Sequence, residues 1–286
     1  MKARTWIRSE CIAVTESNKP VAVITGGSSG LGLVIADRFL NAGYRIAIVG
    51  RNPETLAAAA ASLGASDQDL LQCQNDVGVE ESVAALLAQV QSRFGRLDVL
   101  VNCVGGSDRG LLENLSIAQA ESLFHQNVVT TLLCCKAAIT MLEKTSGVIV
   151  NIGSLGGKVG ARYIGGYALA KHAVSGLTQQ LRLELKPKGI HVGLVSPGPI
   201  RRSDEGKRYE NRVDESLPEQ ANQPGGGTKV KGLAPERVAA AVSACVRKRK
   251  PDVVLPGYLR VLIAVGNAFP RLGDWLLLKF TSSGNR

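Results

Sequence analysis

Short aliphatic runs alternate with amphipathic helical patterns along most of this chain, and this alternation limits the fold more than any other feature. Strand-like runs occur at residues 21–24, 45–49, 69–73, 98–101, 148–151, 190–195 and 252–255. Helical spacing separates them at residues 31–41, 78–94, 116–143, 163–185 and 235–247, and an Ala-rich helix follows Pro53. Parallel strands need crossover helices of this kind. The pattern predicts one α/β domain with a doubly wound, seven-stranded parallel sheet and helices on both faces.

The composition fits such a domain and argues against several other classes. Of 286 residues, 45% are apolar and only 4% aromatic, which suits a buried sheet between helices. The net charge of +10 has one dense cluster, residues 247–250, at a helix end without interleaved aromatics, so we expect no nucleic-acid partner. The six cysteines form no C-x-x-C pair and no histidine lies at metal spacing. We expect no metal site and a reduced, cytoplasmic setting.

Three segments depart from the alternating pattern. Residues 1–19 form a leader that contains two glutamates and no long apolar core, unlike a signal peptide. The α/β domain spans residues 20–258, and a polar, Gly/Pro-rich insertion at about 200–232 has the character of a lid. Residues 259–286 form an apolar C-terminal extension broken by charges and a proline. This extension covers a substrate pocket, forms a subunit contact, lies on a membrane surface or spans a membrane.

A glycine-rich turn joins the first strand to the first helix. Glycines there let the backbone approach a pyrophosphate, which the N–H groups at the helix N-terminus then bind. Glycines also serve tight turns for purely steric reasons, but the position of this turn favours nucleotide binding. The candidate residues are Thr25, Gly26, Ser28, Ser29, Gly30, Leu31 and Gly32.

The second strand ends in Gly50-Arg51-Asn52, without the acidic residue with which NAD-binding proteins commonly hold the ribose. A guanidinium pairs well with a 2′-phosphate, so Arg51 favours NADP(H) over NAD(H). Asp76 and Val77 follow the third strand, where Asp76 either accepts from the adenine amino group or caps the next helix. Asn102 and Gly105 end the fourth strand beside the expected adenosine position, or form a plain turn.

The segment Tyr167-Ala-Leu-Ala-Lys171 places a phenol and an ammonium on one helix face, four residues apart. An ammonium near a phenol stabilises the phenolate, so such a tyrosine can exchange a proton with a carbonyl or an alcohol. Ser154 lies 13 residues earlier, after the fifth strand, where its hydroxyl can hydrogen-bond the same oxygen. A Tyr-x-x-x-Lys pair alone is more often a surface feature; it gains meaning beside Ser154 and the glycine-rich turn.

These motifs together resemble the ordered motif set of the short-chain dehydrogenase/reductase family, in its shorter, single-domain, NADP-preferring branch with a Rossmann fold. The resemblance covers about residues 21–255 and rests on the turn 25–32, Asn102 to Gly105, Asn127, Ser154, Tyr167 with Lys171, and Pro197-Gly198. It implies that Tyr167 is the general acid/base, that Lys171 tunes it and binds the nicotinamide ribose, and that Ser154 orients the substrate. It further implies that Asn127 holds a water that extends a proton relay to Lys171.

The resemblance also implies the remaining cofactor contacts. The sequence departs from the family pattern in two places. Pro197, Gly198 and Ile200 are expected along the nicotinamide, and Asp76 and Val77 beside the adenine. Cys103 and Val104 replace the usual Asn and Ala. The threonine that usually follows this proline-glycine pair is absent, and Ser203 is a candidate replacement.

The resulting hypothesis is an NADPH-dependent oxidoreductase (EC 1.1.1.-) that transfers hydride between nicotinamide and a carbonyl or secondary alcohol substrate of hydrophobic character. Two alternatives remain, a non-catalytic NADP-binding sensor and an epimerase or dehydratase on the same scaffold. The resemblance also implies a homodimer or homotetramer built through the helices around Asn127 and Tyr167.

Overall fold

Seven parallel strands form one sheet in the computed structural model, which describes residues 19–201, 217, 221 and 228–281. The strands are β1 (Val21–Thr25), β2 (Arg45–Gly50), β3 (Leu70–Gln74), β4 (Val99–Asn102), β5 (Val148–Ile152), β6 (His191–Pro197) and β7 (Asp252–Leu255). Their spatial order is β3-β2-β1-β4-β5-β6-β7, and every neighbouring pair is parallel. The order reverses between β1 and β4, which opens a crevice at the carboxyl ends of these strands.

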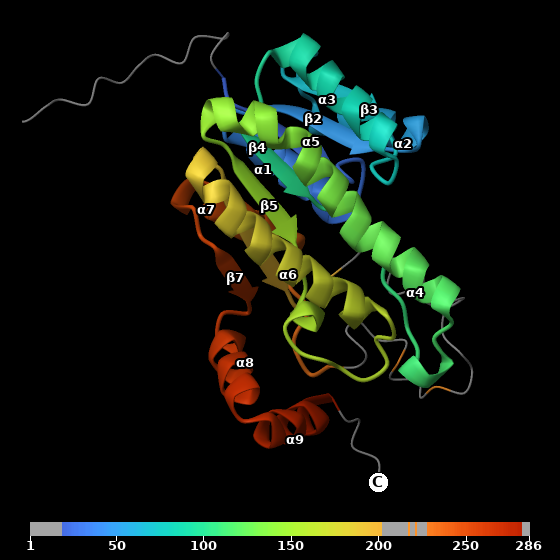
Figure 1. The fold of residues 1–286 in the computed structure, drawn as a ribbon. Coiled ribbons are helices and arrows are strands. Elements are labelled where there is room, and N and C mark those ends of the chain that lie inside the picture. Colours follow the sequence, from blue (N-terminus) through green and yellow to red (C-terminus); the bar gives the residue numbers. More distant parts are fainter. Residues whose placement is uncertain (1–18, 202–216, 218–220, 222–227, 282–286) are drawn as a thin grey trace, which may run out of the picture.

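Helices cover both faces of the sheet, as expected for right-handed crossovers (Figure 1). The helices of one layer are α1 (Gly30–Asn41), α2 (Pro53–Leu63) and α7 (Pro235–Lys248). Those of the other layer are α3 (Glu80–Phe94), α5 (Thr130–Thr145) and α6 (Tyr167–Leu185). Alternation along β1 divides the core, because Ala22 and Ile24 pack with the first layer while Val21 and Val23 pack with the second.

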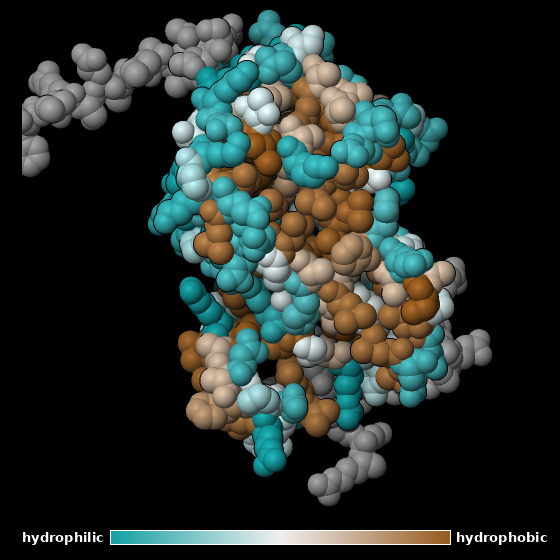
Figure 2. Space-filling view, viewed as in Figure 1, coloured by the Kyte–Doolittle hydropathy of each residue, from teal (hydrophilic) through white to brown (hydrophobic). Residues whose placement is uncertain are grey.

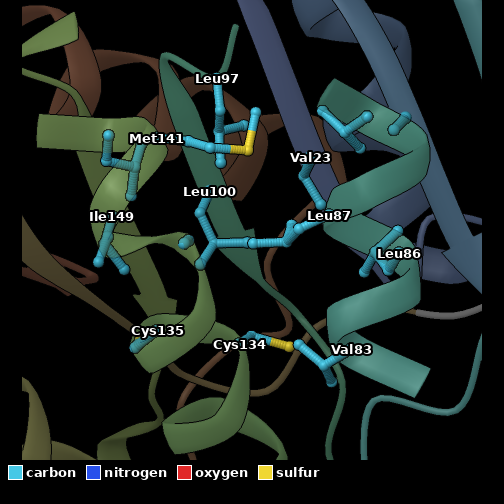
Figure 3. Packing of buried hydrophobic residues seen from close by; sticks show 14 of the residues in the cluster. Val23, Val83, Leu86, Leu87, Leu97, Leu100, Cys134, Cys135, Met141 and Ile149 are labelled. Atoms are coloured by element: carbon cyan, nitrogen blue, oxygen red, sulfur yellow. The ribbon is translucent and has the colours of Figure 1, made fainter. Parts of the chain in front are cut away.

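The second core layer is continuous from α3 to α5. Figure 3 shows Leu100 of β4 between Leu87 of α3 and Met141 of α5, with Ile149 of β5 beside them. Leu100 and Ile149 are completely or almost completely buried. The carboxyl ends of β4 and β5 are therefore fixed relative to the helices on this face.

The predicted sheet is confirmed, and two predicted helices differ at points that matter for the site. The single helix predicted over 116–143 consists of α4 (Ile117–Phe124), a wide π-helical turn (His125–Val129) and α5. The helix predicted from residue 163 begins only at Tyr167. Tyr163 and Gly165 have φ values of 62° and 51°, left-handed conformations that an α-helix does not accommodate.

The predicted leader lies outside the described residues except for Lys19, and so does most of the predicted lid, with Ser203. The base of the insertion is described: Ile200 bridges Leu233, and Arg201 N–H donates to the Leu233 carbonyl at 2.8 Å. The C-terminal extension forms two helices, α8 (Leu259–Ala268) and α9 (Pro270–Thr281). Across the described parts of the chain, we find no helix both long enough and apolar enough to cross a bilayer.

Leu100 provides a test of this core. Truncating it to alanine removes contacts with both α3 and α5, so Leu100→Ala is expected to lower the free energy of unfolding by about 2–5 kcal/mol. Leu183→Ala on α6, whose side chain is 62% exposed, is the matched control and is expected to change stability by less than about 0.5 kcal/mol. Urea unfolding followed by circular dichroism measures both. Equal effects of the two variants would contradict the assigned core.

Candidate active site

A large cleft of about 2700 Å³ follows the carboxyl ends of the strands. It exceeds the volume usual for a drug-sized ligand, so it has room for a dinucleotide and a second molecule. Its lining includes the following predicted residues: Gly26, Ser28, Ser29, Gly30, Leu31, Gly32, Arg51, Asn52, Asp76, Val77, Gly105, Ser154, Tyr167, Lys171, Pro197, Gly198 and Ile200. Thr25, Asn102 and Asn127 are predicted site residues outside this lining.

The glycine-rich turn depends on glycine at three of its positions. Gly26 and Gly30 have φ values of 67° and 51°, and a Cβ on Gly32 would lie 2.1 Å from the Gly26 carbonyl oxygen. Ser29 is the N-cap of α1, and its side chain makes no capping hydrogen bond there. The first N–H groups of α1 therefore remain available to an anion at the cleft.

Arg51 and Asp76 face each other across the ends of β2 and β3. The Arg51 side chain is 80% exposed, and its Nη1 lies 4.0 Å from Asp76 Oδ2, a loose surface pair. Asp76 Oδ1 accepts a hydrogen bond from Gly78 N–H at 2.9 Å, so this oxygen serves the turn before α3. Asn52 caps α2 by accepting from the N–H groups of Glu54 and Thr55. Arg51 thus keeps most of its guanidinium facing solvent at the cleft edge.

Thr25 and Asn102 support the cleft from behind. Thr25 Oγ1 accepts from Cys103 N–H at 3.0 Å and from Val104 N–H at 3.3 Å, which fixes the loop after β4. Asn102 Nδ2 donates to Asn151 Oδ1 at 2.8 Å, and both side chains are buried. Both predicted cofactor residues therefore hold the strand ends in place in this structure.

Tyr167 and Ser154 both lie close to Gly156. A Cβ on Gly156 would be 3.6 Å from Ser154 Oγ and 3.6 Å from Tyr167 Cε1. Ser154 begins the short turn after β5 and accepts from Gly156 N–H at 3.1 Å. Tyr167 is the first residue of α6. The turn and helix meet closely, because a Cβ on Gly157 would lie 2.4 Å from the Lys171 carbonyl oxygen, so only glycine permits this approach.

Lys171 is a buried cation at the centre of the cleft. Its Nζ donates to the Ile152 carbonyl oxygen at 3.0 Å and lies 5.8 Å from the centroid of the Tyr167 ring. Burial lowers the pKa of its ammonium to about 8, and the nearby Cys103 opposes this shift. No carboxylate is among the causes of the shift. The positive charge is thus held beside the phenol at an electrostatic cost.

Asn127 occupies the wide turn between α4 and α5 and is completely buried. Its Nδ2 donates to the carbonyl oxygens of Leu123 and Gly106, at 2.9 and 3.0 Å. The Leu123 oxygen is the acceptor that an α-helix would give to the Asn127 backbone, so the side chain takes the place of that bond. Among the described residues, none is a hydrogen-bond partner of its Oδ1, and a Cβ on Gly105 would lie 2.6 Å from this oxygen and 3.3 Å from Lys171 Nζ. The amide oxygen and the ammonium therefore both lie beside the space that a side chain at position 105 would fill.

Sequence reasoning missed several lining residues. Arg109, in the loop after β4, lines the cleft although its side chain is almost completely buried. Helices α8 and α9 contribute Leu259, Leu262, Ile263, Leu276 and Leu277, so the apolar extension covers one end of the cleft. The apolar composition of residues 259–286 indicated this role among others, whereas nothing in the sequence marked Arg109. Among the described residues, no group of three His, Cys, Asp or Glu side chains is placed to hold a metal ion.

Known proteins are similar to this chain in sequence and in fold. A model of the short chain dehydrogenase family matches residues 20–212. The human 3-oxoacyl-[acyl-carrier-protein] reductase is 33% identical over 199 residues, which is 69% of this chain and 83% of the relative. Among solved structures, ElxO with NADP bound is 30% identical with a TM-score of 0.73, covering 85% of this chain and 99% of that chain. A variant of the actinorhodin polyketide ketoreductase with NADPH is 29% identical with a TM-score of 0.73, covering 84% and 97%.

The family match spans β1 to β6 and includes the glycine-rich turn, the wide turn at Asn127 and the site around Tyr167. The seven-stranded parallel sheet and its helix layers agree with the solved structures over most of their length. On sequence and structure together, this chain belongs to the short chain dehydrogenase family of oxidoreductases.

Proposed function

We propose that this protein is an NADPH-dependent oxidoreductase that interconverts a carbonyl compound and the corresponding secondary alcohol, with Tyr167 as general acid and base. The observation that carries the proposal is the convergence of Ser154, Tyr167 and the buried Lys171 in a cleft that also contains the glycine-rich turn. Names of relatives and neighbours agree with this chemistry, since they include acyl-carrier-protein reductases and a ketoreductase with NADPH.

The residues of the cleft fit a nicotinamide dinucleotide phosphate. The glycine-dependent turn and the uncapped N-terminus of α1 suit a pyrophosphate. Arg51 would hold the 2′-phosphate, with Asn52 beside it, because its guanidinium is exposed and only loosely paired with Asp76. Val77, Gly105, Pro197, Gly198 and Ile200 would line the rest of the cofactor. When bound, the cofactor supplies the hydride that the reduction requires.

The chain itself supplies the proton and the charge stabilisation. In the direction of reduction, the Tyr167 hydroxyl donates its proton to the carbonyl oxygen, and the Ser154 hydroxyl donates a hydrogen bond to the same oxygen. The Lys171 ammonium stabilises the phenolate that remains on Tyr167. In the direction of oxidation, the same phenolate accepts the proton of the alcohol.

A water held by Asn127 would return a proton to Tyr167 through Lys171. The buried Oδ1 of Asn127 has no partner among the described residues and lies beside the same glycine as Lys171 Nζ. An unpartnered buried amide oxygen is costly, and a water that donates to it would remove the cost. Such a water would also contact the ammonium and continue the proton path.

The apolar part of the lining favours a hydrophobic substrate. Leu259, Leu262 and Ile263 of α8, with Leu276 and Leu277 of α9, cover the end of the cleft to which no cofactor residue is assigned. An aliphatic or acyl chain next to the reacting carbonyl would be buried against these side chains. A non-catalytic sensor would not need Ser154, Tyr167 and Lys171 together, and a sugar epimerase would not need this apolar end.

Tyr167→Phe tests the proton-transfer role. Removing the hydroxyl is expected to lower the turnover of NADPH with a panel of ketones about 100- to 10,000-fold, because general acid catalysis is lost. Binding of NADPH, measured by fluorescence titration, is expected to remain nearly unchanged. Tyr163→Phe, at a tyrosine outside the cleft lining, is the control. Turnover retained in Tyr167→Phe refutes the role, whereas binding without turnover by the wild-type protein favours the sensor.

Arg51→Asp tests the choice of cofactor. A carboxylate repels the 2′-phosphate, so the preference for NADPH over NADH in kcat/KM is expected to fall by roughly 100-fold. Arg38→Asp, at an exposed arginine of α1 outside the cleft, is the control for net charge. An unchanged ratio in Arg51→Asp would remove this residue from the phosphate site.

Lys171→Met tests the cost of the buried charge in the cofactor-free protein. The folded pKa of about 8 lies below the ordinary lysine value of 10.5, so the unfolded chain binds more protons between these values. The free energy of unfolding of the wild type therefore rises with pH between these values. Lys171→Met lacks this ionisable group and does not show the rise. The stability advantage of Lys171→Met at neutral pH, up to about 3 kcal/mol, is expected to shrink as the pH rises from 8 towards 10.5. A pH-independent difference in urea unfolding would contradict the buried ammonium.

A further inference from the structure

The hairpin of α8 and α9 has a second apolar face that does not line the cleft. Five large apolar side chains between residues 261 and 278 are 43–66% exposed and lie outside the cleft lining: Val261, Phe269, Leu272, Trp275 and Leu278. We call these five residues the outer face of the hairpin. In α9 they recur at 272, 275 and 278, a helical spacing that gathers them on one side.

The outer face is not buried by the rest of the protein. Among residues 259–279, only Gly273 is buried, and α8 contains no buried residue. The two helices cross closely on each other, since a Cβ on Gly273 would lie 2.8 Å from the Gly266 carbonyl oxygen. In Figure 1 the hairpin lies beyond the carboxyl ends of β5 and β7, apart from the helix layers. An amphipathic hairpin of this kind needs a partner outside the described domain.

Cations surround the outer face. Arg260, Arg271 and Lys279 are exposed, and Asp274 is the one acidic side chain between residues 259 and 279. Lys279 Nζ lies 4.9 Å from the centroid of the Trp275 ring. Figure 2 shows brown side chains interleaved with teal ones at the end of the molecule where α8 and α9 lie. Tryptophan with flanking Lys and Arg is the pattern of helices that lie in a membrane interface.

Charge distinguishes the two candidate partners of the outer face, a second copy of the chain and an anionic lipid surface. In a two-fold contact between copies of the chain, the three cations of each hairpin would meet a surface of the same sign. An anionic lipid surface instead neutralises them while it buries the outer face. Neither helix needs to cross the bilayer for this contact, because the apolar side chains lie along one side of the hairpin.

We propose that the α8–α9 hairpin docks on an anionic lipid surface with Val261, Phe269, Leu272, Trp275 and Leu278 in the interface. Its other side lines the cleft through Leu262, Ile263 and Leu276, so docking places the apolar end of the cleft next to the lipid. Given the proposed reductase function, the substrates of this site are then carbonyl compounds with long apolar chains that dissolve in the bilayer.

Vesicle binding of the full chain tests the docking without cofactor or substrate. In a Trp6→Phe background Trp275 is the remaining tryptophan, so its emission reports on the hairpin. Phosphatidylcholine vesicles containing phosphatidylglycerol are expected to bind the protein and shift this emission to shorter wavelength. Pure phosphatidylcholine and high salt are expected to weaken both effects.

The variant Phe269→Glu/Trp275→Glu, made in the wild-type background, is expected to bind anionic vesicles about 100-fold more weakly in co-sedimentation. The control Val79→Glu changes an exposed apolar residue at the start of α3, a helix to which no subunit contact is assigned, and is expected to bind like the wild type. Circular dichroism and the urea midpoint check that both variants fold. Turnover of a water-soluble ketone is expected to be unchanged in the hairpin variant, which separates this proposal from the proposed function.

Three results would overturn the proposal. The wild-type protein would fail to bind anionic vesicles, or the hairpin variant would bind them as tightly as the wild type. In the third, sedimentation equilibrium without lipid would show a wild-type dimer that the hairpin variant converts to a monomer, which would assign the outer face to a second copy of the chain.

Discussion

The site depends on the hydrogen bond between Lys171 Nζ and the Ile152 carbonyl oxygen at 3.0 Å. This bond ties the first turns of α6 to the last residue of β5 and so fixes Tyr167 relative to Ser154, which lies two residues beyond the strand. The ammonium is buried, and burial lowers its pKa to about 8. A buried cation without a carboxylate partner costs stability, so its presence is best explained by function. The charge would stabilise the phenolate form of Tyr167 beside it and would bind a cofactor in the cleft.

A layer of polar contacts keeps this arrangement rigid. Asn102 of β4 bonds Asn151 of β5, and Asn151 Nδ2 donates to Thr178 Oγ1 of α6 at 2.9 Å. The chain of bonds joins the strand that leads to Ser154 to the helix that carries Tyr167 and Lys171. Thr25 fixes the loop after β4 in the same way. These side chains lie behind the cleft, where the hydrogen bonds between them favour one geometry.

The alternating pattern was enough to predict all seven strands and both helix layers, because buried parallel strands and crossover helices differ clearly in length and periodicity. Residues of the motifs at 25–32, 154 and 167–171 line one cleft in the structure, and their roles there stay predictions. Periodicity could not show the wide turn at Asn127, because that turn arises from a side-chain amide that replaces a backbone bond. It also missed the late start of α6, which depends on left-handed residues at 163 and 165. Arg109 lies in an irregular loop, where tertiary contacts alone decide burial.

The cleft combines two environments that match the two ends of the proposed reaction. Glycine backbone, helix N-terminus and Arg51 suit the charged cofactor, while the α8–α9 hairpin suits an apolar substrate, and Tyr167 lies in the lining that joins them. A crystal structure with NADP⁺ and a ketone inhibitor tests this directly. The account predicts Tyr167 Oη and Ser154 Oγ both at hydrogen-bond distance, about 2.6–3.2 Å, from the ketone oxygen. A phenol turned away from the nicotinamide, with the ketone bound elsewhere, would contradict it.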